Sequence, residues 1–133
     1  MSKINILVIP GWMESVKVFS KVKELLSDYC NFIFIDLPGF NGEKINQTFT
    51  PKEYAKYIYS FAMKNDINFD VILSHSYGSK VAIEYYLKYK KTPLIFVAPA
   101  IVRPNKKVSV KLRVFSYKLL KKLKLLKKEN NYY

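Results

Sequence analysis

Four short apolar runs constrain the fold of this 133-residue chain more than any other feature. Each run is rich in Val, Ile, Leu or Phe, and none of them alternates regularly with polar residues. They span residues 4–9, 32–35, 71–73 and 94–97. Strands of a parallel sheet have this pattern because both faces of the sheet are covered. The runs therefore predict four strands of a parallel sheet.

Segments with helical spacing separate these runs. Three apolar stripes recur at intervals of three or four residues. They comprise Val18, Val22, Leu25 and Leu26; Tyr54, Ile58, Phe61 and Ala62; and Val81, Ala82, Tyr85, Tyr86 and Tyr89. Thr50 and Pro51 are typical of a cap and a first helical residue before the second stripe. The alternation predicts an α/β fold, a three-layer open sheet of about four parallel strands with helices on both faces. Active sites in such sheets lie at the carboxyl ends of the strands.

The charge distribution divides the chain into two parts. Residues 1–100 carry 12 basic and 9 acidic side chains, whereas residues 101–133 carry 11 basic side chains and a single acidic one, Glu129. We expect a core domain over residues 1–104 and a basic segment over residues 105–133. In that segment the apolar residues Val108, Leu112, Phe115, Leu119, Leu123 and Leu126 are three or four positions apart, with lysines between them. This spacing predicts a basic amphipathic helix, or two such helices with a break near Ser116.

Several classes of protein are disfavoured by the composition. The single Cys30 excludes an internal disulfide, and one histidine cannot complete a Cys/His zinc set, so we expect neither a metal nor a cofactor. Neither a G-x-G-x-x-G motif nor a P-loop follows any predicted strand. The basic segment lacks the spaced aromatic residues of a single-strand binder, which disfavours nucleic acid as a partner. The N-terminus has no signal-peptide pattern, and no apolar run approaches the length of a membrane span, so a cytoplasmic protein is expected.

The third predicted strand leads directly into Ser-His-Ser-Tyr-Gly at residues 74–78, and the third helical stripe follows at once. A serine between small residues at a strand-to-helix junction is typical of a nucleophile elbow. At this junction the first amides of the helix and the positive end of its dipole can stabilise an oxyanion. The pattern makes Ser76 the candidate nucleophile.

Together with two other motifs, this segment resembles the α/β-hydrolase superfamily over about residues 3–104. These two motifs are Pro-Gly-Trp at 10–12, which follows the first strand, and Asp-Leu-Pro-Gly-Phe at 36–40, which follows the second. The end of the fourth strand, Ala-Pro-Ala at 98–100, also resembles the family. The resemblance implies that Ser76 is the nucleophile and that the backbone N–H groups of Trp12 and Tyr77 form the oxyanion hole. The implied substrate is a small-molecule ester, thioester or amide. The chain departs from the family's usual motifs at Pro10, where histidine is common, and at Ser74, where glycine is common.

Two further residues near these motifs have alternative interpretations. Asp36 is expected to organise its loop, and a role as the catalytic acid is the less favoured alternative. His75 precedes the candidate nucleophile and should point away from it, so a packed, hydrogen-bonded histidine is favoured over a general base. Trp12 is expected to form a pocket wall as well as to donate its amide.

The sequence lacks the rest of a catalytic triad. In the family the acid and then the histidine follow the fourth strand seen here, but after Pro99 the only acidic residue is Glu129 and there is no histidine. An enzyme without a triad member keeps a rate only about 10³- to 10⁴-fold above that of water. We therefore expect the N-terminal half of a serine hydrolase, nearly inactive alone, in which residues 105–133 resemble the start of a cap. This half is a truncated hydrolase, one part of a split hydrolase, or a fragment of a longer reading frame.

Two expectations about partners follow. The fourth strand should form an uncovered sheet edge, which favours self-association or pairing with another chain. The alternative to an enzyme is a noncatalytic binding or scaffold protein whose basic segment contacts an anionic membrane.

Overall fold

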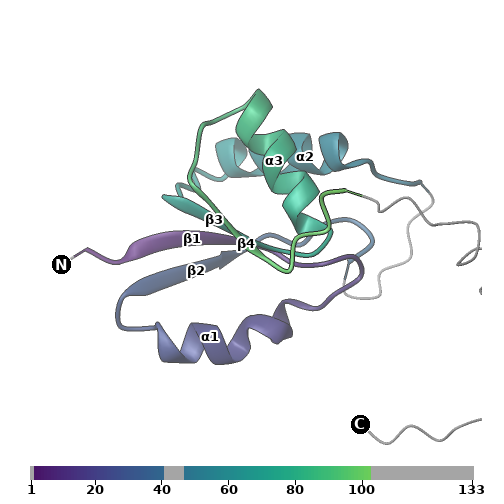
Figure 1. Ribbon diagram of the computed structural model, residues 1–133. Helices are drawn as coiled ribbons and strands as arrows, with labels where there is room; N and C mark the ends of the chain where they lie inside the picture. Colours follow the sequence, from purple (N-terminus) through teal and green to yellow (C-terminus); the bar gives the residue numbers. More distant parts are fainter. Residues whose placement is uncertain (1, 41–46, 103–133) are drawn as a thin grey trace, which may run out of the picture. The chain divides into compact units, whose positions relative to one another are not determined.

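The computed structural model describes residues 2–40 and 47–102, which form a parallel sheet with helices on both sides (Figure 1). The sheet has four strands in the order β2-β1-β3-β4. The strands are β1 (Ile4–Ile9), β2 (Cys30–Phe34), β3 (Val71–His75) and β4 (Leu94–Val97). The predicted parallel α/β fold is confirmed. The predicted basic helix lies outside the described residues.

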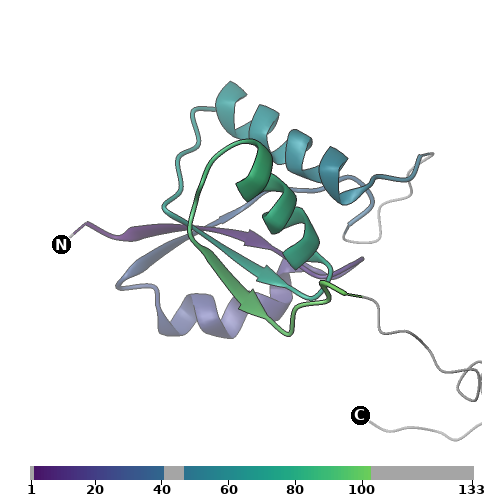
Figure 2. The same cartoon turned by 45° about the horizontal axis from the view of Figure 1, so that its top comes forward.

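The helices form the outer two layers of the fold. The 3₁₀ helix η1 (Val16–Phe19) and α1 (Ser20–Leu25) lie on one face of the sheet, whereas α2 (Pro51–Lys64) and α3 (Gly78–Lys88) lie on the other (Figures 1 and 2). The larger core lies under α2 and α3. Its fully buried side chains include Leu7, Ile9, Tyr54, Ile58, Ile72 and Val81. Both predicted stripes on this face are core-facing except at Tyr86, which is not part of this core.

The apolar stripe predicted around α1 does not face the core. The helical segment forms, but Val18 is 55% exposed and Leu25 is 67% exposed, and of the η1 and α1 residues only Phe19 is buried. Phe19 packs with Ile6 and Val8. The segment begins as a 3₁₀ helix, which has three residues per turn, so an apolar stripe assigned at the α-helical period is out of phase with the buried face.

The register of the sheet determines where chemistry can occur. β1 is paired with β2 on one side and with β3 on the other, and Ile9 lies opposite Ser74. The segments that follow β1 and β3 consequently leave the sheet as neighbours at its carboxyl edge. These segments begin with Pro10 and Ser76, from two of the motifs identified in the sequence.

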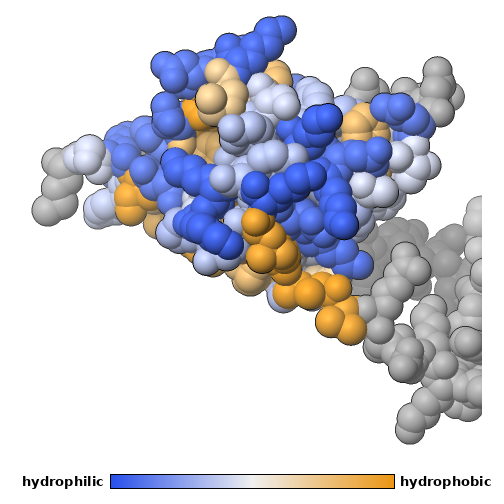
Figure 3. All heavy atoms as spheres, turned by 90° about the horizontal axis from the view of Figure 1, so that it is seen from above, coloured by the Kyte–Doolittle hydropathy of each residue, from blue (hydrophilic) through white to orange (hydrophobic). Residues whose placement is uncertain are grey.

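β4 forms one edge of the sheet and is poorly covered. Among the described residues it is paired with β3 alone, and Ile95 is 47% exposed and Val97 44% exposed. Hydrophobic side chains gather at the surface around β4 and the segment after it (Figure 3). Within residues 2–40 and 47–102 the predicted uncovered edge is therefore present, while its pairing with another chain remains a prediction. In the described part of the chain, no helix has the length and apolar character needed to cross a membrane.

The N-terminal cap of α2 gives a prediction about stability that can be tested by mutation. The Thr50 hydroxyl accepts from the Glu53 N–H at 3.3 Å, and the Glu53 carboxylate accepts from the Thr50 N–H at 2.7 Å. These two bonds form a capping box. The Thr50 hydroxyl also donates to the Glu53 carboxylate at 2.8 Å, and the bonds that this carboxylate accepts, first from the Thr50 N–H and then from the hydroxyl, lower the pKa of Glu53. We expect Thr50→Ala to lower the free energy of unfolding by about 1 kcal/mol in urea titrations, and Thr50→Ser to retain most of it. Equal stability of the two variants would contradict this role.

Candidate active site

The backbone turns sharply at Ser76, between the end of β3 and the start of α3. Ser76 has a φ of 47°, a left-handed conformation that is uncommon for a residue other than glycine. Three hydrogen bonds hold it there. Its N–H donates to the Val97 carbonyl at 3.1 Å, and its carbonyl accepts from the N–H groups of Ser79 at 3.2 Å and Ala100 at 3.0 Å. Ser76 itself is half-buried rather than enclosed in the core.

Small residues allow this turn. A Cβ atom on Gly78 would lie 2.5 Å from the Ile9 carbonyl oxygen and 2.6 Å from that of Pro10, so α3 begins against the end of β1. Ser74 and Ser79 are fully buried, and the Ser74 hydroxyl lies 3.5 Å from the Ser79 hydroxyl. The serine at position 74, where the family commonly has glycine, is thus accommodated within the elbow.

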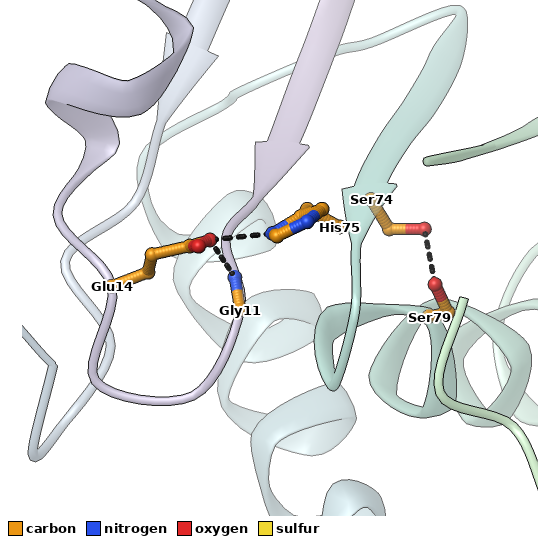
Figure 4. A network of polar contacts seen from close by, with 5 residues as sticks. All are labelled: Gly11, Glu14, Ser74, His75 and Ser79. Carbon is orange, nitrogen blue, oxygen red and sulfur yellow. Dashed lines mark hydrogen bonds and ion pairs between the residues drawn. The ribbon is translucent and has the colours of Figure 1, made fainter. Parts of the chain in front are cut away.

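The loop after β1 is joined to the elbow by a carboxylate–imidazole pair. Glu14 Oε2 lies 2.7 Å from His75 Nδ1, and both side chains are roughly seven-tenths buried, with 29% and 28% exposed. Figure 4 shows the two side chains meeting between the loop and the end of β3, with Ser74 directed to the other side of the strand. The prediction of a packed, hydrogen-bonded His75 is confirmed.

Aromatic rings surround the positions of the two candidate oxyanion-hole residues. The Trp12 ring makes edge-to-face contacts with Tyr77 at 5.1 Å and with Phe40 at 5.9 Å between centroids. Tyr54 contacts Phe40 at 5.4 Å and Tyr77 at 6.4 Å. Trp12 remains 48% exposed despite these contacts. These contacts place the Trp12 ring against Tyr77, the residue that follows Ser76. The role of Trp12 as a pocket wall remains a prediction.

Burial affects the pKa of the two phenols in this group, Tyr54 and Tyr77. It raises the pKa of Tyr54 to about 12, with a smaller contribution from Tyr77, and it raises the pKa of Tyr77 as well. The Tyr54 hydroxyl donates to the Pro38 carbonyl at 2.8 Å. This bond attaches α2 to the loop that follows β2, whose turn includes Gly39 with a φ of 79°. Asp36, at the start of that loop, is exposed.

A model of the alpha/beta hydrolase family matches residues 6–123 of the chain. The chain belongs to this family. Among curated proteins, no sequence matches this alpha/beta hydrolase significantly. The matched range begins within β1 and includes β2, β3, β4 and the three motifs that carry the resemblance.

Solved structures share the fold of this alpha/beta hydrolase. Cfl2 from Burkholderia cenocepacia superposes with a TM-score of 0.70 at 17% identity, over 89% of this chain and 43% of its own. A monoacylglycerol lipase from Paleococcus ferrophilus has a TM-score of 0.64 at 20% identity, over 87% and 46%. The N-formylmaleamic acid deformylase of Pseudomonas putida S16 has a TM-score of 0.63 at 23% identity, over 91% and 50%. The chain spans about half the length of these structures.

The fold brings the hydrolase motifs to one edge of the sheet, but sequence reasoning missed one member of the site. Glu14, the partner of His75, is separated from it by 61 residues. An acidic residue three positions after Gly11 was a signal in the sequence, yet only the adjacency of β1 and β3 shows what it contacts. The roles of Ser76, Trp12 and Tyr77 in catalysis remain predictions.

Proposed function

We propose that this alpha/beta hydrolase is a serine hydrolase in which Ser76 attacks a small-molecule ester, thioester or amide. The observation that carries the proposal is the left-handed Ser76, held by three backbone hydrogen bonds at the junction of β3 and α3. A strained residue at such a junction is characteristic of a nucleophile elbow. The lipase and the deformylase that share the fold are consistent with acyl-group chemistry.

In the proposed reaction, Ser76 Oγ forms a bond to the carbonyl carbon, and the carbonyl π electrons move to its oxygen. The Trp12 and Tyr77 N–H groups then donate to that oxyanion. The amides at the start of a helix have no acceptor within the helix, so the Tyr77–Gly78 segment suits this role. Collapse of the intermediate expels the alcohol, thiol or amine and leaves Ser76 acylated, and water then releases the acid.

The proton of Ser76 needs a base, and the chain contains a single histidine, His75, which pairs with Glu14 through Nδ1. Among the hydrogen bonds of the described residues, none joins the His75 ring to Ser76. We therefore assign the base and its acid to polypeptide beyond the described residues. The chain by itself would supply the nucleophile and the oxyanion hole, so its own turnover should be low.

Imidazole offers a direct test because it can replace the missing base in solution. The 133-residue chain is treated with a fluorophosphonate at several imidazole concentrations, and the modified residue is located by peptide mass spectrometry. We expect phosphonylation at Ser76 with a rate that rises with imidazole. Ser76→Ala should abolish it, and Ser20→Ala, at an exposed serine, should not change it.

Modification that is unaffected by Ser76→Ala, or that does not occur at all in the presence of imidazole, would contradict the proposal. Either result would favour the alternative, a noncatalytic binding protein that keeps the fold.

A further inference from the structure

Glu14 closes the turn from Gly11 to Glu14 with two hydrogen bonds to Gly11. The Glu14 N–H donates to the Gly11 carbonyl at 3.0 Å, and Glu14 Oε2 accepts from the Gly11 N–H at 2.8 Å. Met13, within the turn, has a φ of 56°. Both polar groups of Gly11 are therefore held by Glu14.

This closure orients the amide of Trp12. The Gly11 carbonyl and the Trp12 N–H belong to one planar trans peptide, so they point in opposite directions. When the carbonyl is held toward the Glu14 N–H, the Trp12 N–H is directed away from the interior of the turn. A rotation of this peptide would move the amide away from any oxyanion it serves.

The same carboxylate oxygen also joins the turn to β3. Glu14 Oε2 lies 2.7 Å from His75 Nδ1, and His75 immediately precedes Ser76 (Figure 4). The packing around this oxygen is tight, because a Cβ atom on Gly11 would lie 2.8 Å from Oε2 and 3.2 Å from Nδ1. Glu14 Oε2 is thus hydrogen-bonded both to the Gly11 N–H, in the loop after β1, and to the imidazole of His75, the residue before the elbow.

We propose that Glu14 and His75 are positioning residues that fix the Trp12 N–H relative to Ser76 and the Tyr77 N–H. The inference rests on the proposed function, in which these two amides form the oxyanion hole. Neither side chain needs to touch the substrate. Their role is to hold together two halves of a site that come from segments over sixty residues apart in the sequence.

The test compares disruptive and conservative substitutions at both positions. Glu14→Ala and His75→Phe remove the link, whereas Glu14→Gln keeps an acceptor and His75→Asn keeps a donor close to the position of Nδ1. The readout is the saturation kinetics of Ser76 phosphonylation in imidazole, which separates the limiting rate from the half-saturating probe concentration. We expect Glu14→Ala and His75→Phe to lower the limiting rate about 30- to 100-fold with little change in half-saturation. The limiting rates of the conservative variants, Glu14→Gln and His75→Asn, should stay within about threefold of that of the unmodified chain.

Equal limiting rates in all the variants would overturn the proposal. The proposal would also be overturned if the limiting rate fell in proportion to the free energy of unfolding in every variant, and if Glu14→Gln and His75→Asn did not restore it.

A second readout does not depend on reactivity. We expect the hydrogen exchange of the Gly11 amide, measured by NMR, to accelerate at least tenfold in Glu14→Ala and in His75→Phe. If the unmodified chain does not react at Ser76, the proposed function fails while this measurement still tests the link. Unchanged Gly11 protection in both variants would then overturn the link itself.

Discussion

Gly78→Ala is expected to destabilise the chain by at least about 3 kcal/mol in urea titrations. The added Cβ atom would lie 2.5 Å and 2.6 Å from the carbonyl oxygens of Ile9 and Pro10. These are backbone atoms at the end of the central strand β1, so they cannot rotate away as a flexible side chain could. At an unobstructed helical position, the same change would stabilise the chain by up to about 1 kcal/mol. The sign of the effect therefore tests the close approach of α3 to β1.

Lys88→Ala is the matched control, because Lys88 is exposed near the end of the same helix. It should change the free energy of unfolding by less than about 0.5 kcal/mol. The Gly78→Ala chain, where folded, should also lose phosphonylation at Ser76, since α3 would move away from the loop after β1. A Gly78→Ala chain as stable as the Lys88→Ala chain would contradict the contact.

The sequence allowed the strands to be predicted most accurately where apolar residues extend to their ends. The runs at Ile4–Ile9 and Leu94–Val97 coincide with β1 and β4. The prediction for β3 stopped at residue 73, whereas the strand continues to His75, because Ser74 and His75 are polar. Ser74 is nevertheless fully buried, and its hydroxyl lies within 3.4 Å of the Ile95 carbonyl. The Ser74 hydroxyl can be buried because it donates a hydrogen bond to the neighbouring strand β4. A search for apolar runs does not detect a buried residue of this kind.

The candidate site was predictable to the extent that it is encoded locally. The elbow at Ser76 follows from small residues at a strand-to-helix junction, and its left-handed backbone agrees with that prediction. The Glu14–His75 pair depends on two strands that are adjacent only in the folded chain, so no local pattern specifies it. The orientation of η1 and α1 was also missed, since a 3₁₀ turn changed which side chain, Phe19, reaches the sheet.

Alkaline conditions are expected to destabilise the chain through Tyr54. This side chain is fully buried at the centre of the aromatic cluster, and burial raises its pKa to about 12. The unfolded chain loses the same proton near pH 10, where a phenol normally titrates. The contribution of Tyr54 is therefore complete below pH 10 and falls as the pH rises from 10 to 12, because only the unfolded state releases the proton in that range. The loss amounts to about 2–3 kcal/mol by pH 12.

Tyr54→Phe separates this effect from the titration of other groups. At pH 8 the variant should be less stable than the unmodified chain by about 1–2 kcal/mol, because the Pro38 carbonyl loses its 2.8 Å donor. The difference should shrink or reverse by pH 12, since phenylalanine does not ionise. Part of the alkaline slope should persist in the variant because burial also raises the pKa of Tyr77 and Tyr85. Tyr29→Phe, at an exposed position, should give a curve parallel to that of the unmodified chain. Parallel curves for Tyr54→Phe as well would show that its hydroxyl is not held protonated in the core.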